Sequence, residues 1–328
     1  MAWQSTDLSE AADAYEARDY QRVVQLLQHV PRSYLLATAR YGFMLADSAR
    51  RVGGIPDVLD LNTAVVEASR GLNSETFCDA LNLQGVLLLE SGDAEAARRT
   101  WFDLVDAATL ADNPTHVARA SNNLGVAAIL ALQLDEAITA FQRSVSAYLR
   151  STYSRGLAQS HHNLGIVFRE LDHTDEAHSH FQQAITFGYS ADCVDDVARA
   201  EAEMALLYIY VEKNQQAAMA VARSALMRYT ELGQPAGIAN AMRVIGICSL
   251  SAGDIDGAEQ SLHAALAMGS YRNLPLLEAE TLLALAAHAR RKARALHALQ
   301  LEQQAKDIFA SIYATPWGEQ VGKRMAAL

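Results

Sequence analysis

The sequence predicts an all-α protein made of antiparallel helix pairs that stack on one another. The main observation is an internal repeat of 40 residues, in which residues 121–125 (SNNLG) align with residues 161–165 (HHNLG). None of the six prolines falls inside a predicted helix, which it would break. No alternating strand pattern and no linker rich in Pro, Gly or Ser interrupts the series. The whole chain, 1–328, is therefore expected to form one domain.

Each predicted pair has the same internal spacing. A small residue lies in the middle of the first helix, a second small or slim residue follows twelve positions later, and a bulky apolar residue comes after four more. Glycine in a helix costs about 1 kcal/mol relative to alanine, so its recurrence indicates a close approach of two helices. We expect about seven to eight pairs, at residues 7–30, 33–70, 74–110, 114–151, 154–190, 194–232, 235–270 and 275–314, and a capping tail at 315–328.

The pairs can be justified in order along the chain. The first small residues are Ala11, Gly85, Gly125, Gly165, Ala205, Gly246 and Ala286, and the bulky residues are Leu27, Trp101, Phe141, Phe181, Val221 and Leu262. Turns with Gly followed by Asp at 92–93 and 253–254 supply a helix stop and the next N-cap. Four prolines lie between pairs, Pro56 lies where a second helix should begin, and Pro316 is expected to end the last long helix. The second pair, around Leu45 and Leu61, is the most degenerate.

Composition excludes several classes of protein. A formal net charge of -11, from 27 Lys and Arg against 38 Asp and Glu, disfavours binding to phosphate backbones. No apolar stretch approaches the roughly 18 residues of a membrane span, and residues 1–16 do not resemble an export signal, so we expect a cytoplasmic protein. Cys78, Cys193 and Cys248 are odd in number and far apart, which favours buried, reduced thiols. Abundant Arg beside scarce Lys is typical of GC-rich bacterial genomes.

These motifs resemble the tetratricopeptide repeat over residues 7 to 310. The resemblance rests on Leu124-Gly125, Leu164-Gly165, Gly92-Asp93, Asp19-Tyr20, Ala137 with Phe141, and Ala177 with Phe181. The 40-residue period is most similar to the longer units of kinesin light chain, Pins-type scaffolds and bacterial regulators. The second and last units depart from the pattern, and no helix-turn-helix or catalytic domain is fused to the array. The resemblance implies a right-handed superhelical solenoid with a concave binding groove.

In this family the first helix of each unit lines the groove, at set positions around the small residue. Applied to this sequence, that register selects ten peptide-binding candidates: Asn82, Arg119, Asn122, Asn123, Gln159, His162, Asn163, Arg199, Asn240 and Arg243. An asparagine amide both donates and accepts, so it can pair with a peptide backbone regardless of its side chains. The three arginines would favour an acidic side chain or a carboxylate. A second interpretation is that the asparagines satisfy groups within the scaffold.

Two further segments each allow two interpretations. The basic run of Arg290, Arg291, Lys292 and Arg294 either complements a helix C-terminus in solvent or forms an anionic docking point. The tail residues Trp317, Val321, Met325 and Leu328 recur at near-helical spacing, which favours a capping helix; the alternative is a homodimer contact.

Histidine clusters are weak candidates for chemistry. His173, His178, His180 and Asp175 could suggest a metal site, but His178 and His180 point about 200° apart around a helix. His161 and His162 have no serine, cysteine or carboxylate at a spacing that marks a nucleophile. We therefore expect no catalytic residue, no metal and no cofactor.

The sequence predicts a non-enzymatic adaptor that binds an extended or partly helical peptide segment of a partner protein, as a monomer or as a homodimer through the tail. It does not predict a nucleic-acid or membrane partner. The alternative is a sensory protein whose array binds a small peptide or effector and passes a conformational change to a partner.

Overall fold

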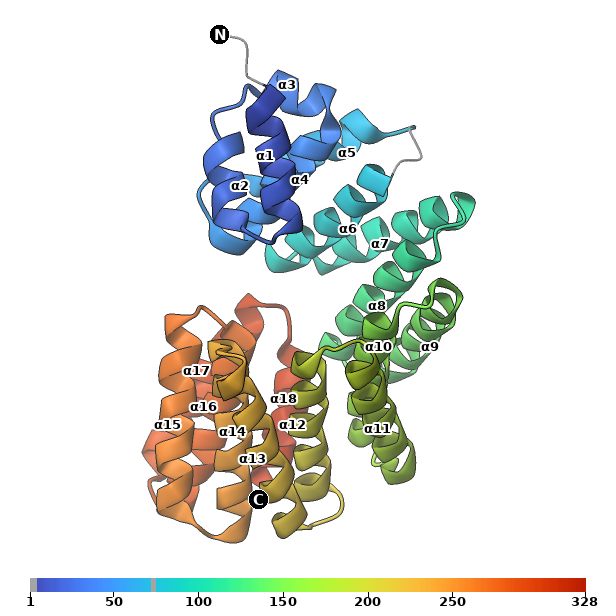
Figure 1. Ribbon diagram of the computed structural model, residues 1–328. Helices are drawn as coiled ribbons and strands as arrows, with labels where there is room; N and C mark the ends of the chain where they lie inside the picture. Colours follow the sequence, from blue (N-terminus) through green and yellow to red (C-terminus); the bar gives the residue numbers. More distant parts are fainter. Residues whose placement is uncertain (1–4, 72–74) are drawn as a thin grey trace. The chain divides into compact units, whose positions relative to one another are not determined.

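The computed structural model describes residues 5–71 and 75–328, and every regular element in these ranges is a helix (Figure 1). Eighteen helices in this described part pack in consecutive pairs, which confirms the predicted all-α class. The chain divides into two compact units, residues 1–123 and 124–328. The division falls inside a continuous helix, α8 (Pro114–Leu130), and no loop marks it.

Unit 1 contains three helix pairs and one additional short helix. Its helices are α1 (Ser5–Glu16), α2 (Tyr20–Leu27), α3 (Arg32–Ala37), α4 (Ala39–Val52), α5 (Val58–Ser69), α6 (Glu75–Glu90) and α7 (Ala94–Leu110), followed by the first part of α8. The sequence did not predict α3, which begins directly after Pro31. Pro56 lies just ahead of α5, whose N-cap is Asp57.

Unit 2 continues the same alternation with helices of similar length. Its helices are the rest of α8, then α9 (Leu134–Ser151), α10 (Ser154–Glu170), α11 (Thr174–Ser190), α12 (Val194–Tyr210), α13 (Gln215–Glu231), α14 (Pro235–Ala252), α15 (Ile255–Tyr271), α16 (Pro275–Arg291), α17 (Ala295–Ser311) and α18 (Thr315–Ala326). Pro316 was expected to end α17. It lies instead in the first turn of α18, where a missing backbone N–H costs nothing.

In the pairs whose small residue is a glycine, that glycine lies directly against the bulky residue of the partner helix. A Cβ added to Gly125 would come within 2.5 Å of the Phe141 ring, and one added to Gly165 within 2.5 Å of Phe181. Phe181 also belongs to a buried cluster with Met204 and Leu207 of the next pair. One aromatic ring therefore packs its own hairpin together and also contacts the following one.

The first and second helices of the pairs form different layers in unit 2. The first helices α10, α12, α14 and α16 each pack on the next first helix as well as on their own partners. The second helices α11, α13, α15 and α17 pack on the helices before and after them in the chain. The first helices thus form a continuous inner layer, which carries the cavity described below.

No helix in the described part of the chain combines the length and apolarity that crossing a membrane requires. Cys78 and Cys248 are buried and free, and burial raises the pKa of their thiols to about 11 and about 12. Cys193, which was expected to be buried, is partly exposed because it lies at the N-cap of α12.

Candidate functional site

A cavity of about 450 Å³ lies on the inner layer of unit 2. Its lining comes from α8, α10, α12, α14, α16 and α18, with Tyr229 from α13. The apolar part of the wall includes Val126, Ile166 and Leu206, which occupy the same position in three successive first helices. The charged part contains four arginines and four carboxylates: Arg169, Arg199, Arg243, Arg324, Glu170, Asp195, Glu203 and Glu280.

Arg169 forms the centre of the charged part and is almost fully buried. Its guanidinium forms ion pairs with Glu203 on α12 and with Glu170, 2.9 Å away on its own helix. Burial alone would lower the pKa of Arg169, but the two carboxylates outweigh that effect and raise it. Burial would likewise raise the pKa of Glu203, and Arg169 lowers it. This buried pair is charged and fully partnered, as buried ions must be.

Helix α18 supplies one wall of the cavity and contacts two first helices. The indole Nε1 of Trp317 donates to Glu280 on α16 at 2.9 Å. Arg324 lies 2.8 Å from Asp172 and donates to the backbone oxygens of Arg169 and Glu170, the last two residues of α10, at 3.2 and 3.3 Å. Arg324 thereby caps a helix C-terminus whose carbonyls lack intrahelical partners.

His162 is a buried polar group on the cavity wall. Burial, reinforced by the charge of Arg199, lowers its pKa to about 3, so the imidazole is neutral at pH 7. Its Nδ1 atom is buried and has no hydrogen-bond partner in the structure. Because Nδ1 is covered, it is an unsatisfied atom inside the wall and is not exposed to the cavity.

Five of the ten predicted groove residues line this cavity: His162, Asn163, Arg199, Asn240 and Arg243. Gln159 lies on α10 but is not part of its lining. The other four belong to unit 1 and are described separately.

In unit 1 the predicted residues are engaged with one another and with acidic neighbours. The Asn123 amide donates to the Asn82 side-chain oxygen at 2.9 Å, a contact within the scaffold. Arg119 lies 3.1 Å from Asp79, whose carboxylate also accepts from His116 Nε2 at 3.0 Å. Asn82 and Arg119 line a more polar cavity of about 510 Å³ in this unit, whereas Asn122 does not.

The three arginines expected to attract an acidic ligand are already paired inside the chain. Arg199 lies 3.1 Å from Asp195, Arg243 lies 3.3 Å from Glu280, and Arg119 pairs with Asp79. Four arginines therefore face four carboxylates in the unit 2 cavity, and no surplus positive charge remains there. The charge argument for an acidic partner is not supported by this geometry.

In a comparison with protein families, the model of the tetratricopeptide repeat matches residues 116–187. Residues 116–187 thus match the tetratricopeptide repeat, as the resemblance predicts. The matched residues cover α8 to α11, where two Gly and Phe pairs repeat after 40 residues. No curated protein sequence matches the chain.

Solved structures share the fold at low sequence identity. The apo form of RapI has a TM-score of 0.66 at 12% identity, over 84% of this chain and 98% of that one. A Rap protein complexed with Competence and Sporulation Factor has a TM-score of 0.65 at 11% identity, over 98% and 96%. A signal transduction ATPase with a tetratricopeptide repeat sensor from Pyrococcus horikoshii has a TM-score of 0.52 at 15% identity, over 89% and 52%. These likenesses show the fold.

The position of Arg169 within the repeat could have predicted that it lines the cavity. Arg169 lies four positions after Gly165, and the family pattern places that position in the groove. Tyr210, Tyr229 and Trp317 had no such signal, because they come from a helix end, a second helix and the tail. Ile247 occupies the same position after Gly246 as Ile166 does after Gly165, but it is fully buried in the core and does not line the cavity.

The basic run at the end of α16 forms ion pairs with both neighbouring helices. Lys292 lies 2.7 Å from Glu259 and 3.2 Å from Asp256 on α15. Arg290 pairs with Glu302 on α17. These contacts tie successive hairpins together, so the run is neither simply solvated nor an empty anionic docking point.

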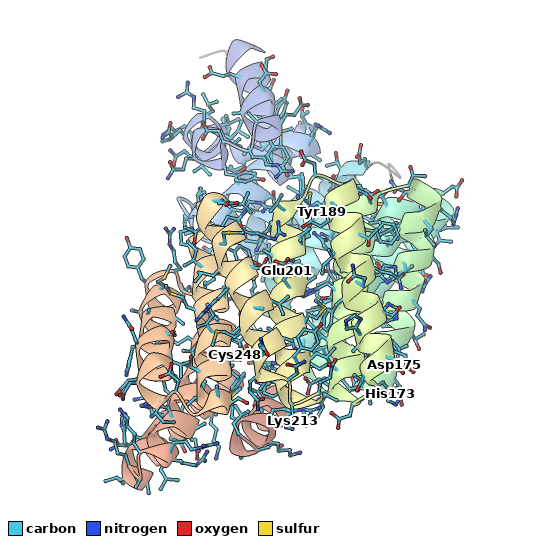
Figure 2. The ribbon with its side chains drawn as sticks, turned by 60° about the horizontal axis from the view of Figure 1, so that its bottom comes forward. His173, Asp175, Tyr189, Glu201, Lys213 and Cys248 are labelled. Atoms are coloured by element: carbon cyan, nitrogen blue, oxygen red, sulfur yellow. The ribbon has the colours of Figure 1, made fainter. Side chains whose placement is uncertain are left out.

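The histidines near the turn of α10 and α11 diverge. His173 and Asp175 lie at the turn end of these helices (Figure 2). His180 lies 3.0 Å from His161, Nδ1 to Nδ1, and stacks on Phe168, whereas His178 faces Tyr208. Among the residues that the structure describes, no cluster of three or more His, Cys, Asp or Glu side chains could hold a metal ion.

Helices α11, α12 and α13 share further polar contacts outside the cavity lining. Figure 2 shows Tyr189 on α11 and Glu201 on α12, and Arg228 of α13 joins them. Its Nε donates to Glu201 at 3.0 Å and its Nη2 donates to the Tyr189 hydroxyl at 2.8 Å. These hydrogen bonds link three consecutive helices. The three polar residues therefore have a structural role.

Proposed function

We propose that this tetratricopeptide repeat protein is a non-enzymatic adaptor that binds a short peptide segment of a partner protein in the unit 2 cavity. The observation that carries the proposal is the cavity wall itself, where polar side chains such as Asn163 and Asn240 alternate with apolar ones such as Val126 and Ile166. The volume of about 450 Å³ falls within the range of about 300–1,000 Å³ typical of ligand cavities.

Recognition in this proposal depends on hydrogen bonds more than on net charge. The carboxylates and arginines of the wall balance one another, so a ligand with a strong net charge gains little there. The asparagine amides of the wall can pair with backbone groups of a bound segment. Extended segments rise roughly 3.3 Å per residue and helices pack roughly 8 to 10 Å apart, so adjacent first helices would address peptide positions about three residues apart.

A second function is favoured by the way α18 closes one side of the cavity. A ligand that changes the contacts of α18 with α10 would alter the structure of unit 2, as in a sensor. Two of the structural neighbours support this alternative: one is a Rap protein in complex with Competence and Sporulation Factor, and the other carries a tetratricopeptide repeat sensor.

Catalysis is not part of the proposal. The buried histidine of the cavity has a pKa far below neutrality, and the buried thiols of Cys78 and Cys248 have raised pKa values, so none of these groups is tuned for proton transfer or attack at pH 7.

The proposal can be tested by selecting binders from a random-peptide display library. We expect Arg199→Ala with Asn240→Ala to lower the affinity for the selected peptides at least tenfold, because both side chains line the cavity. The matched control is Gln159→Ala with Arg223→Ala, which removes the same types of group outside the cavity lining. Equal binding by both double variants would refute the proposal. Small-angle scattering of wild-type protein with a selected peptide then separates a rigid adaptor from a sensor that compacts.

A further inference from the structure

Helix α18 has the features of an element that can leave its place. It is only 12 residues long, whereas the helices of unit 2 before it have 17 or 18. It contains Gly318 and Gly322, and a Cβ added to Gly322 would meet nothing within 4 Å. Gly322 therefore weakens the helix without any packing reason for it. Local contacts alone make α18 a marginal helix.

The packing around α18 is incomplete on two sides. On one side lies the inner-layer cavity, with Trp317, Val321 and Arg324 in its wall. On another side a cavity of about 710 Å³ runs between α17 and α18, lined by residues that include Lys306 and Lys323. Trp317, Val321 and Met325 are buried in the core, but the two cavities leave other parts of α18 unpacked, and incompletely packed terminal elements open first.

The contacts that hold α18 against α10 are polar and connect residues far apart in the chain. Gln320 donates to Glu170 at 3.0 Å across 150 positions, and Arg324 reaches Glu170, Asp172 and the end of α10. In Figure 1, α18 lies beside α12, consistent with Arg324 over the Tyr210 ring at 5.9 Å. Asp172 is largely solvent-exposed, so its ion pair with Arg324 contributes little, whereas Glu170, the other acidic partner of Arg324, is buried.

We infer that α18 is a displaceable wall of the cavity and competes with the partner segment for it. When α18 leaves, Glu170 loses Gln320 and Arg324, and Glu280 loses the Trp317 indole. Glu170 keeps Arg169 and Glu280 keeps Arg243, but each carboxylate loses a hydrogen-bond donor that the segment replacing α18 must restore. The partner chemistry that fits is an amphipathic helical segment with an aromatic donor and a basic residue. This inference rests on the proposed function and adds its regulation.

The first experiment needs no partner. We expect Arg324→Ala to speed hydrogen exchange of α18 amides at least tenfold and to leave exchange in α14 to α16 unchanged. Lys323→Ala is the matched control, because it removes the same charge from the same helix at a residue outside the α10 contacts. Gly322→Ala should slow exchange in α18. If α18, α16 and α17 lose protection together in Arg324→Ala, then α18 is a structural cap and the inference is overturned.

The second experiment supplies α18 in trans. A synthetic peptide with the sequence of residues 315–328 should bind full-length Arg324→Ala at least tenfold more tightly than wild type or Lys323→Ala. Asp172→Ala removes the ion pair between Asp172 and Arg324 by a change outside α18, at an exposed residue. The outcome therefore does not depend on whether Arg324→Ala disturbs the folding of α18. Equal binding to all four proteins would overturn the inference. The hydrogen-exchange experiment uses no partner. It therefore tests the displacement of α18 even if the cavity binds no peptide.

Discussion

At the scale of single residues, glycine is placed where an aromatic ring from the paired helix leaves no room for a side chain. Gly165 lies under Phe181, which is fully buried and cannot move aside. We expect Gly165→Ala to lower the free energy of unfolding by about 1–3 kcal/mol, because overpacking outweighs the better helix propensity of alanine. Chemical denaturation of purified protein measures this difference.

The matched control for that substitution is Gly322→Ala. It makes the same chemical change in a helix with open space around the new Cβ atom, so only the propensity effect applies. It should raise the free energy of unfolding of α18 by about 1 kcal/mol. Destabilisation by both substitutions, or by neither, would contradict the packing explanation.

A second residue-scale prediction concerns pH. The folded protein holds the pKa of His162 at about 3, while the unfolded chain has the ordinary value of about 6.5. Between these values the unfolded state binds more protons, so this residue reduces stability as pH falls below about 6.5. The effect should reach about 2 kcal/mol at pH 5. In His162→Gln the free energy of unfolding should depend less on pH over this window; parallel curves for the two proteins would rule out the assigned cause.

At the scale of elements, the helix starts follow local chemistry that sequence alone can indicate. Asp93 and Asp254 each accept a hydrogen bond from a backbone N–H of the first turn, as their turns predict. The helix ends are less regular. The turn after α14 uses Gly253, whereas the turn after α8 places Leu132 at a φ of 57°. A leucine rarely adopts that conformation, so no residue preference marks that turn.

Helix α18 shows the limit of element-scale prediction. Its existence was predicted from the spacing of apolar residues in the tail, whereas Pro316, which was expected to end α17, lies in its first turn. Its contacts with α10 were not, because they bring together residues about 150 positions apart. The sequence therefore indicated a helix, and only the packed structure showed that this helix forms a wall of the cavity.

At the scale of the whole molecule, stacked pairs contact mainly their neighbours, so a local defect should stay local. Leu27 is fully buried in the core of unit 1, and Leu207 is fully buried in unit 2. Each substitution to alanine should cost about 2–5 kcal/mol in its own unit. Hydrogen exchange should accelerate in α1 to α5 for Leu27→Ala and in α10 to α13 for Leu207→Ala. Equal acceleration in both units for either variant would show cooperative unfolding of the entire chain.

Half of the ten predicted groove residues line the candidate site. His162, Asn163, Arg199, Asn240 and Arg243 line the unit 2 cavity because the repeat fixes which face of each first helix turns inward. Asn82 and Asn123 follow the same register but bond to each other. The position of a residue within the repeat decides which way its side chain points. It does not specify which residue that side chain will contact.

The sequence by itself determined the helix pairs and their glycine and aromatic packing, because these depend on residues within one 40-residue repeat and on the fixed geometry of the helix. The tertiary structure decided which charges pair and which helix closes the cavity. Arg243 finds Glu280 on the next first helix, and Arg324 finds the end of α10 four pairs earlier. Such contacts depend on the small rotations that accumulate from one pair to the next, which no local sequence pattern specifies.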